Sequence, residues 1–292
     1  MVKKTLAPSV THRDNKGRKF ISIVEAAYDK AGLSDEEAQR INETPGLADL
    51  VGDFITRNRH QNQFANEEIN SNYTYPESYN VRPIAEQVAR LKELFPELNG
   101  ANLEIAKGEL PEGAEGWFAI PRWDKLGKGY PKAFEQRVIP ALSAAFPKFY
   151  NYRKGELSAK YLRQHQCTIE MYKRLATEQE RYDILIVPAQ FGLRHRGRSV
   201  RRAREMFVAN EFGLGAFAVG CMLLTHPERL VRWEQLHIDC GGDEYSWYAA
   251  GGWASCLGFR FRGDQLEFRA HWLYDAHQDF GSASGFLGSV TA

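Results

Sequence analysis

An arginine block between Arg194 and Arg204 is the feature of this sequence that most directly indicates a ligand. The block reads RHRGRSVRRAR and holds six arginines in eleven residues. Ser199 is a typical helix N-cap, so Arg201 and Arg202 are expected in the first turn of a helix. A helix N-terminus already carries about half a positive charge, and its free N–H groups bind anions. The block therefore predicts a bound phosphate group or a polyanion.

A second basic stretch, residues 148–154, interleaves cations with aromatic side chains. Cations neutralise phosphates and tyrosines stack on unpaired bases, so this stretch extends the predicted nucleic-acid surface. The simpler alternative is that its aromatic residues belong to the core or its rim. The residues expected to hold phosphates are Arg194, Arg196, Arg198, Ser199, Arg201, Arg202, Arg153 and Lys154.

Residues 192–199 also fit the pattern GxxxxG(K/R)(S/T) between a predicted strand and a predicted helix. The stretch thus resembles a degenerate Walker A loop of the P-loop nucleotide-binding proteins. The resemblance implies backbone N–H groups around phosphates, magnesium at Ser199 and a partner carboxylate at Asp239. Arg198 stands where that family has lysine, and four residues separate the strand from Gly192.

His237 and Asp239 are alternative candidates for catalysis or metal binding because they share one face of a predicted strand. Imidazoles and carboxylates can bind a divalent ion and support phosphodiester hydrolysis. No ligand spacing matches an established metal motif, so the sequence favours a solvated turn and predicts no bound metal or cofactor. Cys240 with His237 or His271 could form a nucleophilic pair, but packing at a strand end is the simpler interpretation. The groups that could join such a site are Asp243, Glu244, His271, Asp275, His277 and Asp279.

The elements that must position these residues indicate an α+β fold (mixed α/β). Residues 1–60 read as a helical N-terminal subdomain whose first fifteen residues are disordered, and 61–82 as a linker or long loop. Residues 83–280 read as the main domain, with a small mixed sheet, packed helices and a C-terminal β-hairpin. The stretch 281–292 is rich in glycine and serine and reads as a flexible tail.

Apolar periodicity and capping signals predict the individual helices and strands. The buried run 182–188 is expected in a parallel or mixed sheet. The predicted helices are three within 19–58, the first ending at Gly32 and the second opening with a Ser34/Glu37 capping box, then 83–95, 131–145, 158–179, 200–212, an apolar helix to 224, and one opening with a Thr225/Glu228 capping box. The predicted strands are 116–121, 182–188, 236–240 and a hairpin over 259–274 that turns at Gly263-Asp264.

Charge is distributed unevenly along a chain whose formal net charge is only +1. Residues 121–204 contain 19 Lys and Arg against 7 Asp and Glu, and the rest contains 19 against 30. Such asymmetry indicates nucleic acid as partner, or else pairing of the basic middle with the acidic flanks.

Three hypotheses follow from these patterns. The leading one is a nucleic-acid-binding protein. The others are an enzyme that uses the 192–199 loop as an anion site, and a charge-complementary homo-oligomer. Four widely spaced cysteines, no signal-peptide pattern and no apolar run long enough to span a bilayer predict a cytoplasmic protein with no membrane contact.

Overall fold

The computed structural model describes residues 15–59, 63–249 and 251–288, and residue contacts divide the chain into two units. The first unit is Met1–Val51 and the second is Gly52–Thr291. No helix in these described stretches is long and apolar enough to cross a membrane.

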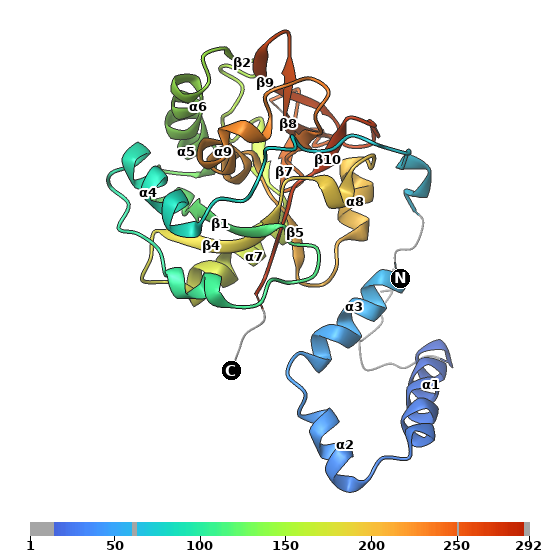
Figure 1. Ribbon diagram of the computed structural model, residues 1–292. Helices are drawn as coiled ribbons and strands as arrows, with labels where there is room; N and C mark the ends of the chain where they lie inside the picture. Colours follow the sequence, from blue (N-terminus) through green and yellow to red (C-terminus); the bar gives the residue numbers. More distant parts are fainter. Residues whose placement is uncertain (1–14, 60–62, 250, 289–292) are drawn as a thin grey trace, which may run out of the picture. The chain divides into compact units, whose positions relative to one another are not determined.

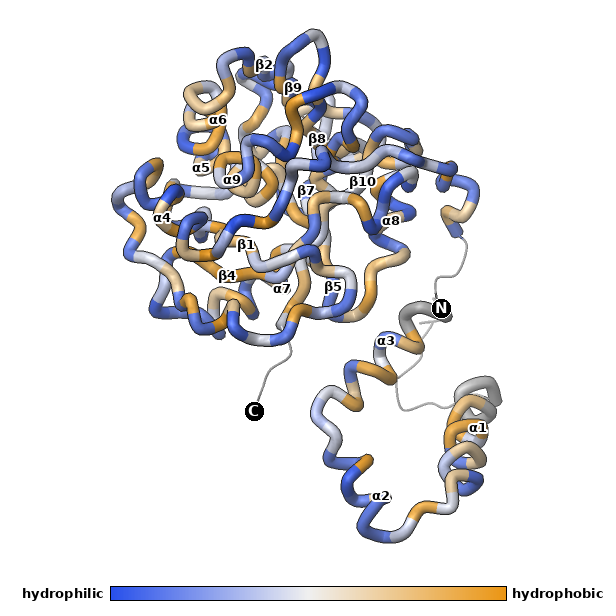
Figure 2. Tube along the Cα trace, in the orientation of Figure 1, coloured by the Kyte–Doolittle hydropathy of each residue, from blue (hydrophilic) through white to orange (hydrophobic). Residues whose placement is uncertain are grey.

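The first unit holds α1 (Asn15–Ala31), α2 (Asp35–Asn42) and the start of α3 (Leu47–Arg59). The three predicted helices are therefore confirmed. Gly32 ends the first with a positive φ of 60°, and the predicted Ser34/Glu37 capping box opens the second. The expected disorder of the first fifteen residues concerns mainly residues 1–14, which lie outside the described chain. Figure 2 shows apolar and polar residues alternating along α1 and α3, as amphipathic helices require.

The second unit is an α+β fold, as the sequence predicts (Figure 1). Its helices are α4 (Ile84–Leu94), α5 (Tyr130–Ala133), α6 (Ile139–Ala145), α7 (Gln166–Glu178), α8 (Val200–Met206) and α9 (Ala216–Thr225), with a π-helical turn, η4, at Phe134–Val138 and 3-10 turns at Ala65–Glu67 (η1), Leu103–Lys107 (η2), Trp123–Lys125 (η3), Leu193–His195 (η5) and Pro227–Arg229 (η6). Its strands are β1 (Gly116–Pro121), β2 (Phe149–Asn151), β3 (Leu162–Gln164), β4 (Ile184–Gln190), β5 (Glu211–Gly213), β6 (His237–Asp239), β7 (Asp243–Tyr245), β8 (Ser255–Arg262), β9 (Gln265–Trp272), β10 (Phe280–Ser282) and β11 (Ser284–Phe286).

A four-stranded antiparallel sheet, in the order β1-β4-β11-β5, contains the most apolar strand. All seven residues of β4 are buried, because helices pack against this sheet: α4 and α9 contact β1, and α7 contacts β4 and β5. The prediction that the run 182–188 lies in a parallel or mixed sheet is wrong. Burial on both faces gives the same continuous apolar run in an antiparallel strand, so the run could not distinguish the two.

A larger mixed sheet carries the residues discussed below. Its strands follow the order β10-β6-β8-β7-β3, and β9 joins β8 to the short β2 (Figure 1). The predicted hairpin turn is confirmed, with positive φ at Gly263 and Asp264. One face of the sheet buries Leu257, Phe259 and Phe268 in the core. Alternation along the strands therefore turns the neighbouring polar residues to the opposite face.

Two predicted helices are shorter than the sequence indicated. The helix expected over 158–179 begins only at Gln166, because 162–164 pairs with β7 as an edge strand. The helix expected over 200–212 ends at Met206, and 211–213 pairs with β11. In both cases pairing to a distant strand overrides local helical periodicity.

Two further predictions near the C-terminal half are wrong. Thr225 does not open a capping box, since its hydroxyl donates to the carbonyl of Met222 and a 3-10 turn follows. The glycine- and serine-rich stretch 281–285 is not flexible, because it lies in the buried strands β10 and β11. Small side chains fit there because the backbone of Gly281 lies directly against that of Gly192.

Candidate metal centre beneath the arginine helix

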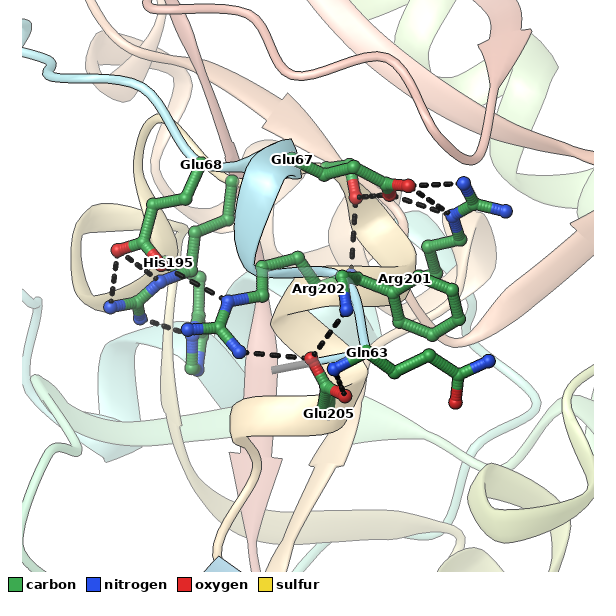
Figure 3. Close-up of polar contacts among 10 residues, drawn as sticks. Gln63, Glu67, Glu68, His195, Arg201, Arg202 and Glu205 are labelled. Atoms are coloured by element: carbon green, nitrogen blue, oxygen red, sulfur yellow. Dashed lines mark hydrogen bonds and ion pairs between the residues drawn. The ribbon is translucent and has the colours of Figure 1, made fainter. Parts of the chain in front are cut away.

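The arginine block occupies the loop before α8 and the first turns of that helix, and acidic residues of the same chain pair with most of it; Figure 3 shows these contacts for Arg201 and Arg202. Arg201 binds Glu67, and Arg202 lies 3.1 Å from Glu68 and 2.9 Å from Glu205. The guanidinium of Arg198 also binds Glu68, at 2.9 Å, and that of Arg194 binds buried Glu211, at 3.3 Å. Backbone carbonyls accept the other two: Tyr73 from Arg196, and Gly241 and Asp243 from Arg204.

The anion at the N-terminus of α8 is the carboxylate of Glu67. Ser199 is the predicted N-cap, and its Oγ accepts from the backbone N–H of Arg202. The Ser199 hydroxyl donates to Glu67 Oε2 at 2.7 Å, and its N–H donates to the Glu67 carbonyl at 3.0 Å. Burial opposes the charge of Glu67, but the hydrogen bonds from Arg201 and Ser199 outweigh it and lower the pKa of this carboxyl. The carboxylate of Glu67 thus provides the negative charge that the helix N-terminus and its arginines favour.

The loop that resembles a Walker A motif uses its backbone donors internally. The N–H of Leu193 donates to the Tyr75 hydroxyl at 2.9 Å, and that of Gly197 to the carbonyl of Phe280, also at 2.9 Å. On the helix itself, the N–H of Arg201 donates to the carbonyl of Leu273. A phosphate would have to displace these bonds, which differs from the open cradle of a P-loop.

The basic stretch 148–154 divides into a structural and an exposed part. Arg153 binds Glu156 at 2.9 Å and stacks 4.6 Å from the ring centroid of Trp247. Lys154 and Tyr150 are exposed, and Tyr150 lies edge-on to Tyr152 with ring centroids 4.5 Å apart.

Beneath α8, on the polar face of the larger sheet, Asp239, Cys256 and His271 converge from β6, β8 and β9. Cys256 Sγ lies 3.3 Å from His271 Nε2, and Asp239 Oδ1 lies 2.8 Å from the same nitrogen. All three potential ligand atoms lie within 4.8 Å of one another. Asp239 is 1% exposed and Cys256 is 0% exposed, so the strands fix the three groups in a solvent-poor place.

Strand register explains this convergence. Cys256 is directly opposite His271 in the β8–β9 hairpin, and Asp239 is opposite Gly258. A Cβ at Gly258 would lie 3.3 Å from the His271 ring and 3.5 Å from Asp239 Oδ1. Glycine at this position therefore provides the space in which the three side chains meet.

Electrostatics favour a cation among these side chains. Burial alone would lower the pKa of His271, but the adjacent Cys256 and Asp239 groups outweigh burial and raise the pKa well above its usual value. Burial raises the pKa of Cys256, opposed by the charge of His271. Arg204 also acts on Cys256 from the α8 side.

Several buried polar atoms beside the cluster have no hydrogen-bond partner among the described residues. They include Ser282 Oγ, whose residue pairs with Asp239 in register, while the contact of Asp239 Oδ1 is its ion pair with His271. Buried oxygens without partners cost about 1–3 kcal/mol each, so such a cluster is typical of an ion or water site.

The other predicted acidic and imidazole groups serve different purposes. His237 is 3% exposed and lies 3.3 Å from Asp279, on the same sheet face as Asp239 but outside the three-residue cluster. Glu244 pairs with Arg163 at 2.7 Å, and Asp243 accepts from the N–H of Ala216 at the start of α9. The ring of His277 packs against that of His271, and Cys240 is buried in the core.

Cys256 is the residue that sequence reasoning missed. The predicted turn at Gly263-Asp264 already contained the signal, because a two-residue turn pairs position 262 with 265 and, counting back, Cys256 with His271. The contribution of Asp239 carried no comparable signal, since it depends on the direct pairing of β6 with β8, two strands that the unpredicted strand β7 separates along the chain.

Comparison of the chain with protein-family models, with curated proteins and with solved structures finds no match.

Proposed function

We propose that Asp239, Cys256 and His271 bind one divalent transition-metal ion, with zinc preferred, and that the chain is a metal-dependent hydrolase. The observation that carries the proposal is the convergence of three ligand atoms within 4.8 Å of one another, from three rigid strands. Thiolate, imidazole and carboxylate together are a zinc ligand set.

The main alternative for these residues is a cysteine nucleophile with a histidine base. In such a triad the acid orients the base through one ring nitrogen and the nucleophile contacts the other. Asp239 and Cys256 instead both lie against Nε2 of His271. Groups gathered around one point suit a metal, because zinc bonds of about 2.0–2.3 Å place tetrahedral ligands roughly 3.3–3.7 Å apart. The Cys256–His271 separation of 3.3 Å fits that range, whereas the 2.8 Å ion pair between Asp239 and His271 would have to lengthen to admit the ion.

Three protein ligands leave a fourth position of a tetrahedral site for water, the arrangement of catalytic rather than structural zinc. A zinc ion held by these residues would supply a water-derived nucleophile at neutral pH. The unpartnered hydroxyl of Ser282 lies beside Asp239 and would add a hydrogen-bonding group to the edge of the site. A free thiol persists most readily in a reducing compartment, which is the location that the sequence predicts.

Metal content tests the proposal. The native chain is expected to retain about one zinc per chain by mass spectrometry, and its cobalt form to show a thiolate-to-cobalt charge-transfer band. Cys256→Ser is expected to abolish that band, and Asp239→Asn and His271→Gln to weaken zinc binding at least tenfold. Cys167→Ser, at a partly exposed cysteine away from the cluster, is the matched control and is expected to bind normally. Stoichiometric zinc that is indifferent to all three ligand substitutions would overturn the assignment.

Nucleic-acid binding is a second proposed function, and one observation favours it. The polar sheet face that carries the cluster also carries Arg269 on β9, with exposed Arg262 at the end of β8. Among the described residues neither has a carboxylate within ion-pair distance, and both lie on the side of the exposed pair Tyr150 and Tyr152. Cations beside accessible rings are the elements of a single-strand binding surface.

Salt dependence separates this surface from the arginine block. Binding of a fluorescent oligonucleotide is expected to weaken as salt rises, and Arg262→Gln/Arg269→Gln together to lower the slope of log K against log salt by about 1–2. Arg201→Gln serves as the comparison, since Glu67 already pairs with this arginine. Unchanged binding in the double variant would contradict the proposal, and a large loss in Arg201→Gln would favour the original arginine-block hypothesis.

A further inference from the structure

A cavity of about 260 Å³ lies between α7, the N-terminal end of α9 and the segment after β1, separate from the metal cluster. Its walls are mostly apolar and include Trp123, Tyr172 and Phe217. The volume is just below the range of about 300–1,000 Å³ for drug-sized ligands, so it suits a smaller molecule.

The aromatic walls pack against one another around Tyr130, which defines the shape of the cavity. The ring of Tyr130 packs edge-on against Trp123, with centroids 6.3 Å apart, and tilted against Phe217 at 6.2 Å. The hydroxyl of Tyr130 donates to buried Asp243 at 2.7 Å. Gly215 makes this arrangement possible, because a Cβ there would lie 2.3 Å from the Tyr130 hydroxyl oxygen.

The charges around the cavity favour a ligand that carries a negative charge. Arg122 and Asp124 both line it, but they pair with each other at 2.9 Å and largely cancel. Lys173, exposed on α7, also lines it and has no carboxylate partner among the described residues. Glu170, one turn earlier on α7, accepts from Gln166 instead. One uncompensated ammonium beside an apolar cavity complements a molecule with an apolar body and a single negative charge.

We propose that this cavity binds a small carboxylic acid whose aromatic or aliphatic body packs against Trp123 and Phe217 and whose carboxylate pairs with Lys173. Gln164, also at the cavity, can donate its side-chain amide to the same carboxylate. Because the site shares no ligand with the Asp239–Cys256–His271 cluster, the proposal is independent of metal binding.

Paired probes test the proposal on the full chain. Titration calorimetry is to compare 2-naphthoate with neutral 2-naphthamide, which matches its size but lacks the charge. The native chain is expected to bind the acid at least tenfold more tightly than the amide. Lys173→Gln is expected to remove that preference, and Lys92→Gln, an exposed lysine of α4 outside the cavity, to preserve it.

Filling the cavity is the second arm of the test. Ala176 lines it from α7, so Ala176→Phe is expected to weaken both probes more than tenfold while the thermal unfolding midpoint stays close to that of the native chain. If Ala176→Phe unfolds, the lysine variants still decide the matter, because Lys173 is at the surface. The proposal is overturned if neither probe binds the native chain, if both bind equally well, or if a folded Ala176→Phe chain binds them normally.

Discussion

Folding changes the pKa of the Asp243 carboxyl group, so this group makes the stability of the fold depend on pH. It is fully buried, and accepts from the Tyr130 hydroxyl and from the N–H of Ala216, each at 2.7 Å. Burial raises its pKa from 3.8 to about 7, against the lowering effect of those two hydrogen bonds and of Arg204, while Glu244 adds to the rise. The folded chain therefore holds a proton here that the unfolded chain releases near pH 4.

We expect the contribution of Asp243 to the free energy of unfolding to fall as pH rises from about 4 to about 7 and then to level off, because over this window the folded state binds more protons at this carboxyl. The fall is a few kcal/mol, at about 1.4 kcal/mol per pKa unit. Urea denaturation at several pH values, compared with Asp243→Asn, measures it. The difference between the two chains should itself vary with pH, and parallel curves would show that this carboxyl does not titrate in the window.

Two glycines with the same φ allow the energetic cost of backbone strain to be separated from the cost of steric crowding. Gly192 and Gly251 both have a φ of +126°, but a Cβ at Gly192 would lie 2.5 Å from the Gly281 carbonyl oxygen, and one at Gly251 would meet nothing within 4 Å. Gly251→Ala is expected to cost about 1–3 kcal/mol, the price of the angle alone. Gly192→Ala is expected to cost clearly more by chemical denaturation, since backbone atoms cannot move aside. Equal losses would mean that the loop and β10 are less tightly apposed than described.

Among the elements, the segment around η1 supplies carboxylates that neutralise the arginines of α8. Glu67→Ala leaves the Ser199 hydroxyl and Arg201 without their acceptor, so we expect the free energy of unfolding to drop by about 1–3 kcal/mol. Hydrogen exchange at the N–H of Ile69, which bonds to the Gly197 carbonyl at 2.8 Å, should accelerate. Glu77→Ala, exposed in the same segment, is the control and should leave both quantities unchanged. Exchange that is equally slow in Glu67→Ala would show that contacts other than those of Glu67 hold this segment in place.

Local signals predicted most elements and failed where distant pairing decided. The Ser34/Glu37 box, the N-cap Ser199 and the turn at Gly263-Asp264 depend on neighbouring residues only, and all three are present. Residues 211–213 and 281–285 became strands because partners far along the chain complete their hydrogen bonds. The candidate site follows the same division: two of its three residues, Cys256 and His271, could be paired by counting from the hairpin turn, and Asp239 could not.

At the scale of the whole molecule, the charge asymmetry of the sequence is partly resolved within one chain. Basic residues of the middle region pair with acidic residues outside it, as Arg201 does with Glu67, Arg163 with Glu244 and Arg137 with Glu97. This agrees with the simpler of the two interpretations of that asymmetry. A homo-oligomer held by the same charges stays a prediction, and it would have to compete with these internal pairs.

The division of the chain into two units predicts that the larger one keeps its stability alone. Buried residues of the described chain begin only at Glu67, and the hydrophobic core begins at Leu91. Removal of residues 1–46, which takes away α1 and α2 but leaves α3 whole, is therefore expected to shift the thermal unfolding midpoint by no more than about 2–4 °C, the effect of about 1 kcal/mol at this size. Circular dichroism during heating measures the shift. A fall well beyond that range would reveal a stabilising role for the first unit.

The pairing of Cys256 with His271 across a hairpin has a consequence for the order of folding. A slip of one residue between β8 and β9 would turn one of these side chains to the opposite face of the sheet and break the convergence with Asp239. A metal ion held by all three would bind the correct register and reject the slipped one. The ion would then stabilise the correct alignment of β8 and β9 during folding. The native sheet would thus be selected before the site binds a substrate.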